Sequence, residues 1–490
     1  LGASELAAGL LRGVPSLVES VADVAIDSVP PGVKDWAIAT FGTWNKVALV
    51  IGIVLTLAVL GAGIGVLARR SLLLAGAALV LLGMVGVAAA VLAGRPGGGA
   101  VAGATAAVLA GLIALRWLLG RGRAPDNAPD AGPDAGRRAF LVAAGVVAGL
   151  AALSAAAGRT LVEQGKRVLA GRDGVVLPTA SQPLPPPAPE ASFPESGISP
   201  LVTPNEDFFR IDTALSVPRV DLESWRLRIH GMVETPYELS FEDLLGMDMV
   251  ERWVTLSCVS NTLGGNLVGN AAWLGVPLGV LLDRAGVRPG ADQVVGRSVD
   301  GFTVGVPTSA ARDGRDALVA IGMNGEPLPF EHGFPARLVV AGLYGYVSAT
   351  KWLSEIELTT WDAFDAYWVP RGWSKEAPVK TQSRIDTPRT GTRLSAGERA
   401  IAGVAWAPHV GITRVEVQLD EDPWQEAELA ESLDRNSWRQ WRLVWNPEPG
   451  VHVIRVRATD ASGYTQTDER TPPAPDGATG HHIVRVTVEA

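Results

Sequence analysis

The sequence predicts a multi-domain fold, with an α-helical transmembrane anchor, then an α+β domain, then an Ig-like β-sandwich. At 490 residues the chain is too long for one ordinary domain. Several apolar runs before residue 158 reach the roughly 20 residues that a helix needs to cross a bilayer. Strand and helix patterns mix over 201–375, and short alternating strands recur over 380–490, as in a sandwich.

The charge of the chain divides near the same place as its hydropathy. Residues 1–158 contain 11 Lys or Arg and 8 Asp or Glu, so with a total of −9 the later residues carry −12. This acidic later part argues against nucleic acid as a partner, because phosphates bind Lys and Arg. Cys258 is the one cysteine, which excludes Cys-rich zinc and iron–sulfur sites.

The N-terminal part is expected to hold an amphipathic segment over 1–46 and a four-helix transmembrane region over 47–158. The amphipathic segment either lies at the interface or follows a span outside this chain. Buried helices of a soluble protein are the alternative, which successive apolar runs with short Gly- and Arg-rich breaks disfavour. Residues 1–158 contain no histidine, so no bis-His haem is expected in the bilayer. The spans are expected near 47–67, 72–93, 100–119 and 139–157.

Arginines predict the orientation of these spans. The loop after the second span contains one arginine, Arg95, whereas the loops after the first and third spans contain several. These two loops are therefore expected in the cytoplasm. Their arginines are Arg69, Arg70, Arg116, Arg121, Arg123, Arg137 and Arg138. Residues 136–158 also resemble an internal twin-arginine translocation signal, a route for folded, cofactor-loaded domains. Plain stop-transfer arginines are the alternative. Both interpretations predict a multi-pass cell-membrane protein whose later domains are extracytoplasmic.

A Pro-rich linker is expected over 159–200, because seven prolines fall within 178–194 and favour an extended spacer. In the α+β domain that follows, over 201–375, "ERWVTLSCV" reads as a strand that ends at Cys258. The sandwich over 380–490 contains five tryptophans, which are expected to pack in its core or at interfaces rather than to form sites. They are Trp406, Trp424, Trp438, Trp441 and Trp445.

Two segments carry residues suited to chemistry. Cys258 precedes a loop rich in Gly and Asn, and glycines there would let the backbone approach a large ligand. The thiol is a small buried hydrophobe, a nucleophile that needs a His base, or a thiolate ligand to a soft metal. Farther on, His332, Arg337 and Lys351 are spaced by Gly and Pro turns, which favours an anion cradle over a solvated surface.

Both segments resemble the molybdopterin-dependent oxidoreductases of the sulfite oxidase family. The motifs "TPNEDFFRIDTALSVP", "WRLRIHGMV", the Cys258 loop, "MNGEPLPFEHGFPARLVV" and "TKWLSEIEL" occur in the order of that family. The resemblance covers about residues 200–490 and implies a sulfite-oxidase-type molybdopterin domain followed by a dimerisation-type sandwich. The apolar N-terminal region resembles the membrane-anchored, actinobacterial-type branch.

The resemblance implies a molybdenum–molybdopterin cofactor, with Cys258 as the catalytic thiolate ligand to the metal. The cofactor-binding residues that it implies are Phe209, Arg210, Asp300, His332, Arg337, Ser348 and Lys351. No haem, flavin or iron–sulfur motif accompanies them, so electrons would pass to a cytochrome or quinone-linked partner. The chain would act as a homodimer or as a subunit of a complex.

Departures from the family concern the substrate. Leu263 stands where sulfite oxidases carry an Arg, and Ile321-Gly322 where they carry a Tyr. Ile211-Asp212-Thr213 replaces Arg-Asn-His, and Arg435 or Arg439 of the sandwich could supply a positive charge instead. We therefore expect oxygen-atom transfer on a small sulfoxide-like or sulfite-like substrate. The alternative is a membrane-anchored cofactor-binding or assembly subunit without turnover.

Overall fold

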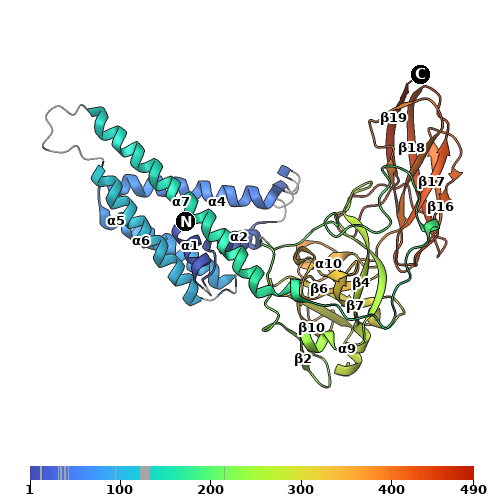
Figure 1. Ribbon diagram of the computed structural model, residues 1–490, viewed down its shortest axis with the longest axis horizontal. Helices are drawn as coiled ribbons and strands as arrows, with labels where there is room; N and C mark the ends of the chain where they lie inside the picture. Colours follow the sequence, from blue (N-terminus) through green and yellow to red (C-terminus); the bar gives the residue numbers. More distant parts are fainter. Residues whose placement is uncertain are drawn as a thin grey trace. The chain divides into compact units, whose positions relative to one another are not determined.

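The computed structural model describes residues 1–489 except 12, 13, 31, 32, 34, 35, 38, 39, 42, 43, 94, 96, 122–132 and 215. The side chains of 27, 121, 133–137, 139 and 163–170 are likewise outside the description. Arg123 and the side chains of Arg121 and Arg137 thus lie outside the described residues. The chain forms two compact units, Leu1–Leu169 with Ala214–Val217, and Ala170–Thr213 with Pro218–Ala490 (Figure 1).

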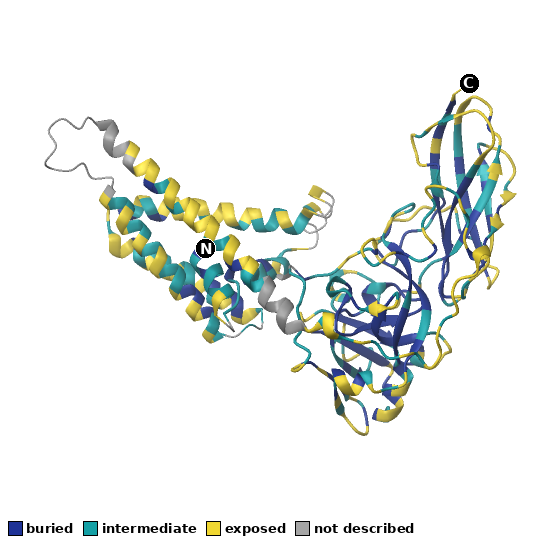
Figure 2. Cartoon of the chain, in the orientation of Figure 1, coloured by how far each residue is buried: buried dark blue, intermediate teal, exposed yellow. Residues whose placement is uncertain are grey.

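The first unit is helical. Four helices are long and apolar enough to cross a membrane, by length and composition, which confirms the helices predicted from the apolar runs. Their apolar side chains are mostly exposed, as Figure 2 shows. Ser71 begins one of them by accepting a hydrogen bond from the Leu74 N–H, as an N-cap does. The helices are α1 (Gly2–Leu10), α2 (Leu17–Ser28), α4 (Asn45–Ala68), α5 (Leu72–Leu92), α6 (Gly97–Arg121) and α7 (Pro133–Ala170).

Helices α1 and α2, from the segment expected to be amphipathic, pack against the longer helices. A Cβ atom at Gly2 would lie 2.4 Å from the Ala151 carbonyl oxygen, and one at Gly158 would lie 2.2 Å from that of Glu5. Only glycine permits this approach of α1 to α7, as in other closely packed helix pairs. Leu17 of α2 packs among buried alanines of α5 and α6.

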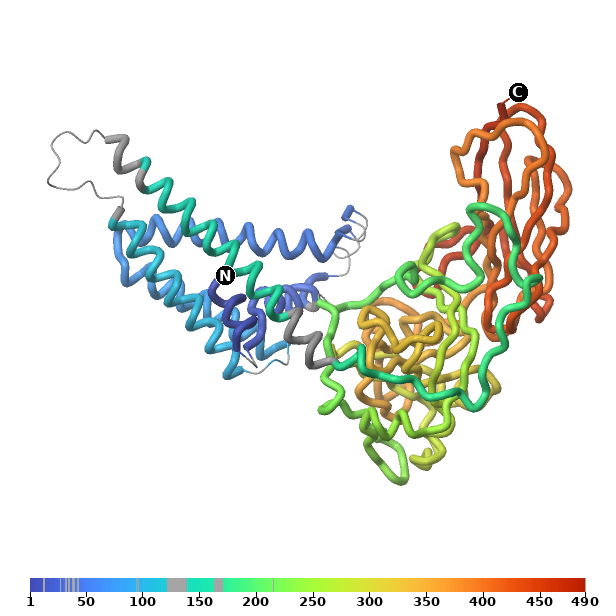
Figure 3. The backbone as a smooth tube through the Cα atoms, viewed as in Figure 1, coloured from blue at the N-terminus to red at the C-terminus, as the bar shows by residue number. Residues whose placement is uncertain are grey.

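The Pro-rich segment, predicted as an extended spacer, lies against the second unit. Helix α7 continues to Ala170, and the segment after η2 (Arg172–Gly174) lies along the second unit, where Figure 3 shows it in green. Gln182 forms a parallel bridge with Val250, and the Phe193 N–H donates to the Gln440 side chain at 2.7 Å. Apolar residues between the prolines, such as Ala191 in η3 (Pro189–Ala191) and Leu201, are buried against the sandwich and hold the segment there.

The α+β domain is built on two sheets, whose strand orders are β2-β1-β10-β5-β6 and β3-β4-β7-β8, with β9 paired to β7. Strands β3 and β7 are buried almost throughout, so their sheet forms the interior of the domain (Figure 2). The strands are β1 (Arg226–Gly231), β2 (Tyr237–Ser240), β3 (Val250–Ser257), β4 (Val268–Pro277), β5 (Gln293–Ser298), β6 (Thr303–Pro307), β7 (Ala317–Met323), β8 (Glu326–Pro327), β9 (Arg337–Val340) and β10 (Leu353–Thr359). The helices are α8 (Phe241–Leu245), α9 (Leu278–Ala285), α10 (Gly345–Ser348), η4 (Thr308–Ala311), η5 (Phe330–His332) and η6 (Val369–Arg371).

Two further sheets form a sandwich over the last part of the chain, in the orders β11-β13-β17-β16 and β12-β19-β18-β14-β15. They share one core, in which Ile401 and Trp441 of the first sheet meet Val415 and Val456 of the second. The strands are β11 (Gln382–Thr387), β12 (Arg393–Ser395), β13 (Arg399–Trp406), β14 (Ile412–Leu419), β15 (Gln425–Glu426), β16 (Glu428–Leu429), β17 (Arg439–Trp445), β18 (Gly450–Asp460) and β19 (His482–Glu489).

Candidate functional site

One pocket of the α+β domain collects most of the residues singled out in the sequence. Phe209 comes from the segment before β1 and Asp300 from the turn between β5 and β6. Cys258 follows β3, His332 ends η5, Arg337 begins β9, and Lys351 lies between α10 and β10. The pocket is lined by Phe208, Phe209, Ile211, Asp212, Thr213, Leu256, Cys258, Ser298, Asp300, Phe302, His332, Arg337, Gly345, Tyr346, Ala349, Lys351, Trp352 and Trp368. The fold thus joins segments that are up to about 160 residues apart in sequence.

Cys258 lies directly after β3, at the start of the loop that leads into β4. Its N–H donates to the Leu267 carbonyl at 2.9 Å, and the Leu267 N–H donates to the Asn261 side chain at 2.9 Å, so the loop is closed on itself. The thiol is buried, and burial raises its pKa. A soft metal ion at the sulfur would reverse this effect, because metal binding favours the thiolate.

The glycines of this loop make room for protein side chains, which differs from the expectation that they admit a ligand. A Cβ atom at Gly269 would lie 2.8 Å from the ring of Phe208, itself a pocket residue. Gly264 has φ +72°, and its Cβ would lie 2.1 Å from the ring of His482 in the sandwich. Gly264 is therefore packed against the sandwich, and Gly269, at the start of β4, is packed against an aromatic side chain of the pocket.

Arg337 is a buried cation, with 5% of the residue exposed. Its guanidinium donates to the His332 carbonyl at 3.0 Å and lies over the Trp273 ring, 4.9 Å from the centroid. No described carboxylate forms an ion pair with it. Burial lowers its pKa to about 9. A buried charge without a counter-charge is costly, so the pocket favours an anionic group beside Arg337.

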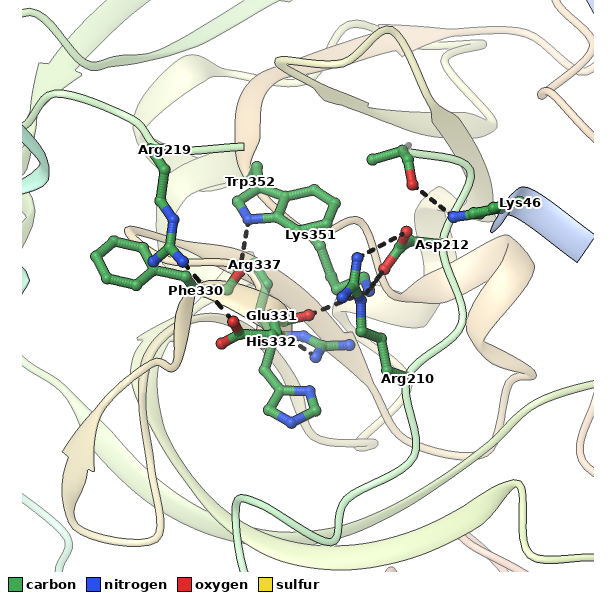
Figure 4. A network of polar contacts seen from close by, with 11 residues as sticks. Lys46, Arg210, Asp212, Arg219, Phe330, Glu331, His332, Arg337, Lys351 and Trp352 are labelled. Atoms are coloured by element: carbon green, nitrogen blue, oxygen red, sulfur yellow. Dashed lines mark hydrogen bonds and ion pairs between the residues drawn. The ribbon is translucent and has the colours of Figure 1, made fainter. Parts of the chain in front are cut away.

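Lys351 and Arg210 share the carboxylate of Asp212, as Figure 4 shows. Lys351 Nζ lies 2.8 Å from the carboxylate and Arg210 Nε lies 2.7 Å from it, while Lys351 also donates to the Glu331 carbonyl at 3.2 Å. Burial lowers the Lys351 pKa to about 8, and the charge of Asp212 opposes that shift. Two cations and one carboxylate leave a positive charge here, in addition to that of Arg337.

His332 is held as a neutral imidazole. Its Nε2 donates to the Asn205 carbonyl at 2.9 Å, and the edge of Phe208 packs against its ring. Burial, the larger cause, and the positive charge of the nearby Arg337 lower the pKa of His332 to about 4. With Nε2 donating to a carbonyl, Nδ1 of the neutral ring can accept a hydrogen bond without adding charge to the pocket.

This low pKa predicts a pH-dependent stability. In the unfolded chain a histidine titrates near its ordinary value of about 6.5, so below that pH the unfolded state binds more protons than the folded one. The free energy of unfolding should fall between about pH 6.5 and pH 4, by on the order of 3 kcal/mol for His332 alone. Tryptophan-fluorescence melting of the full chain in detergent measures this, and His332→Gln should flatten the profile; an unchanged profile would contradict it.

Three predicted residues are less directly connected with the pocket. Ser348 and Arg210 do not line it, whereas Asp300 does. The Ser348 hydroxyl donates to the Leu343 and Tyr344 carbonyls at 3.1 and 3.0 Å, within its own turn. The Asp300 carboxylate lines the pocket but accepts from the Phe302 N–H at 3.2 Å. Arg210 reaches the pocket only through Asp212. These three assignments remain predictions from the resemblance.

The alternative cations of the sandwich are occupied elsewhere. Arg439 donates to the Ala430 and Ile412 carbonyls, and Arg435 donates to the Gly314 carbonyl. Leu263 lies beside Gly480 of the sandwich, and its side chain does not line the pocket.

Sequence reasoning missed several lining residues. Asp212 was read only as a departure from a motif, although it is the carboxylate that faces Lys351. The aromatic walls formed by Phe208, Tyr346, Trp352 and Trp368 carry no local signal, because aromatic residues in such patterns usually pack in a core. The spacing of Asp212 after "FFR" was the one clue available.

The residues present fit a molybdopterin cofactor. Among the described residues, no group of three or more His, Cys, Asp or Glu could hold a metal ion, so a metal at Cys258 would have to bring its other ligands with it. A molybdenum bound to an organic dithiolene does so. The buried Arg337, which has no carboxylate partner among the described residues, suits the phosphate of such a cofactor, and the aromatic walls suit a flat pterin ring.

Comparisons with known proteins agree with this pocket. A family model, oxidoreductase molybdopterin binding domain, matches residues 214–368. Mitochondrial sulfite oxidase of Rattus norvegicus is 30% identical over 322 residues, which cover 55% of this chain and 58% of that protein. The uncharacterized oxidoreductase YuiH of Bacillus subtilis is 34% identical over 153 residues, which cover 31% of this chain and 74% of that protein.

A solved structure supports the fold. The sulfane dehydrogenase SoxCD of Paracoccus pantotrophus matches with a TM-score of 0.52 at 24% identity, over 62% of this chain and 88% of that one. The chain spans 58% of the length of the rat sulfite oxidase that it matches. The matched domain and these relatives show that this chain belongs to the sulfite oxidase family of molybdopterin-binding oxidoreductases.

Proposed function

We propose that this chain is a membrane-tethered, extracytoplasmic molybdenum oxidoreductase that transfers an oxygen atom to or from a small substrate. The observation that carries the proposal is the buried thiol of Cys258 in one pocket with Arg337, a buried cation that has no carboxylate partner among the described residues. When bound, the molybdenum cofactor supplies two-electron redox chemistry and an oxygen atom for exchange. Electrons pass to a separate cytochrome or quinone-linked partner.

The chain's own residues bind and orient the cofactor in this proposal. Arg337 and Lys351 donate charge-assisted hydrogen bonds to its anionic group, and Nδ1 of the neutral His332 ring accepts a hydrogen bond. The aromatic side chains Phe209, Tyr346 and Trp368 exclude water from the metal, which strengthens electrostatic interactions inside the pocket. Cys258 holds the metal from the protein side.

The lining favours a neutral, sulfoxide-like substrate. Leu263 replaces a cationic residue and turns toward Gly480, so the Cys258 loop offers no cation to a sulfite-like dianion. A desolvated oxyanion needs such donors. Sulfite remains the second candidate, because Arg337 and Lys351 line the same pocket.

The test uses the full chain, loaded with cofactor and purified in detergent. Dimethyl sulfoxide should reoxidise the reduced metal, as followed by its absorbance, at a higher rate than sulfite reduces the oxidised metal. The reverse order would assign a sulfite-like substrate. Bound molybdenum whose redox state no such substrate changes would support the alternative of a binding or assembly subunit.

The proposed topology has its own test. A periplasmic-type reporter fused after Ala490 should be active only outside the cytoplasmic membrane, because the arginine-rich loops are retained inside. If the twin-arginine route is used, Arg137→Lys with Arg138→Lys should abolish export of the folded, loaded domain. The matched control is Arg69→Lys with Arg70→Lys, which keeps charge in another loop. Reporter activity in the cytoplasm would overturn the topology.

We also propose that the sandwich is Ig-like and of the dimerisation type found in this family. Its two sheets around one core support that assignment. The domain boundaries proposed from the sequence are 201–375 and 380–490.

A further inference from the structure

The loop that carries Cys258 touches the sandwich on its far side. The thiol faces the pocket of the α+β domain, whereas Gly264 and Gly265 face strands β11 and β19. Two residues of these strands, Arg384 and His482, make the contacts. Neither residue lines the pocket.

Arg384 fixes one carbonyl of the loop. Its guanidinium donates to the Gly265 carbonyl at 2.7 Å, to the Ser199 hydroxyl at 2.7 Å and to the Asp386 carboxylate at 2.6 Å. The residue is buried, with 7% exposed. Three partners in different directions hold the planar guanidinium in one position, and a charged donor makes a strong bond to the carbonyl. The Gly265 carbonyl is therefore held by the sandwich.

His482 supports the neighbouring glycine. Its Nδ1 accepts a hydrogen bond from the Ile385 N–H at 3.0 Å, so the ring is anchored to β11. Its other edge lies against Gly264, where a Cβ atom would be 2.1 Å from Nε2. The loop can take this path only because residue 264 is a glycine at φ +72°.

The strand before Cys258 is held from the same domain. The Thr255 N–H donates to the Asn436 carbonyl at 2.9 Å, and the Trp438 N–H donates to the Thr255 hydroxyl at 2.8 Å. Contacts from the sandwich therefore lie on both sides of the cysteine in the chain. The α+β domain supplies the pocket, and the sandwich fixes the segment that presents the thiol to it.

We propose that Arg384 and His482 are positioning residues that hold the Cys258 loop so that its sulfur points into the pocket. The orientation of a metal by this sulfur rests on the proposed function. The positioning of the thiol does not, because it concerns contacts within the chain alone. The sandwich thereby gains a role beyond assembly.

The single cysteine makes the test selective. In cofactor-free full chain, made in a host that cannot synthesise the cofactor, an uncharged maleimide can react only at Cys258. Arg384→Met should raise the reaction rate on the order of 10- to 100-fold, the usual effect of losing a buried hydrogen bond to a charged group on local opening. The control Arg393→Met removes an exposed arginine of the same sandwich, which pairs with the exposed Glu489, and should leave the rate unchanged.

A second set of variants keeps the inference testable if Arg384→Met folds poorly. Gly264→Ala should raise the rate because its methyl group meets the His482 ring, and adding His482→Ala should relieve part of that effect. Additive effects of the two substitutions, or equal rates in Arg384→Met and wild type at matched melting temperature, would overturn the inference.

The loaded protein gives a readout that a general loss of stability does not produce. Arg384→Lys should shift the electron paramagnetic resonance signal of the metal while the molybdenum content stays near wild type. An unshifted signal would count against a role at the metal. A wild-type chain without molybdenum would end the proposed function but leave the thiol-reactivity result standing.

Discussion

Cys258→Ser should lower the molybdenum content of the purified chain by more than about 100-fold, because loss of outer-shell partners alone costs about 10- to 100-fold in metal affinity. The substitution is nearly isosteric, and no other cysteine can replace the ligand. A hydroxyl does not ionise at neutral pH as a metal-bound thiol does. Molybdenum per chain, measured by mass spectrometry of the metal, gives the result.

The control for this prediction is Ser224→Ala, which removes an exposed hydroxyl of the same unit that hydrogen-bonds to Asp221. It should keep the wild-type molybdenum content. Cofactor-free Cys258→Ser should also melt close to the cofactor-free wild type, which separates ligand loss from misfolding. A variant that keeps its molybdenum would remove Cys258 from the metal site.

Arg337→Met should have opposite effects on loading and on stability. Without cofactor, the substitution removes a buried charge that has no carboxylate partner among the described residues, and such replacements are often neutral or stabilising. With cofactor, it removes charge-assisted hydrogen bonds to the anionic group, so affinity should fall by about 100-fold if two such bonds are lost. Melting temperature of the cofactor-free chain and molybdenum per chain measure the two effects.

Asp212→Asn provides the comparison of opposite sign. It removes the carboxylate that neutralises the buried Lys351 and the exposed Arg210, so Lys351 should bind the anionic group of the cofactor more tightly. The cofactor-free chain should become less stable, since Lys351 would lose its ion pair.

Equal loading of Arg337→Met and wild type would show that the pocket does not hold an anion at Arg337.

Much of the architecture was predictable from local sequence. The apolar helices, the strand that ends at Cys258 and the alternating strands of the sandwich follow from residue periodicity along a few turns or a few strand positions. The Pro-rich segment was predicted as an extended spacer, and what the sequence did not predict is that it lies along the second unit, because Ala191 and Leu201 between its prolines are buried against the sandwich. The number of prolines in a segment does not reveal that the apolar residues between them will be buried.

By itself the sequence determined the thiol, the cation-bearing segment around His332 and Arg337, and the family, because these depend on residue types in a fixed order. Only the tertiary structure decided which charges compensate one another and what supports the thiol. Lys351 meets Asp212, 139 positions away, and Arg384 meets Gly265, 119 positions away. Hydrogen bonds and ion pairs act over about 3–4 Å in space, whatever the separation along the chain, so no local pattern contains them.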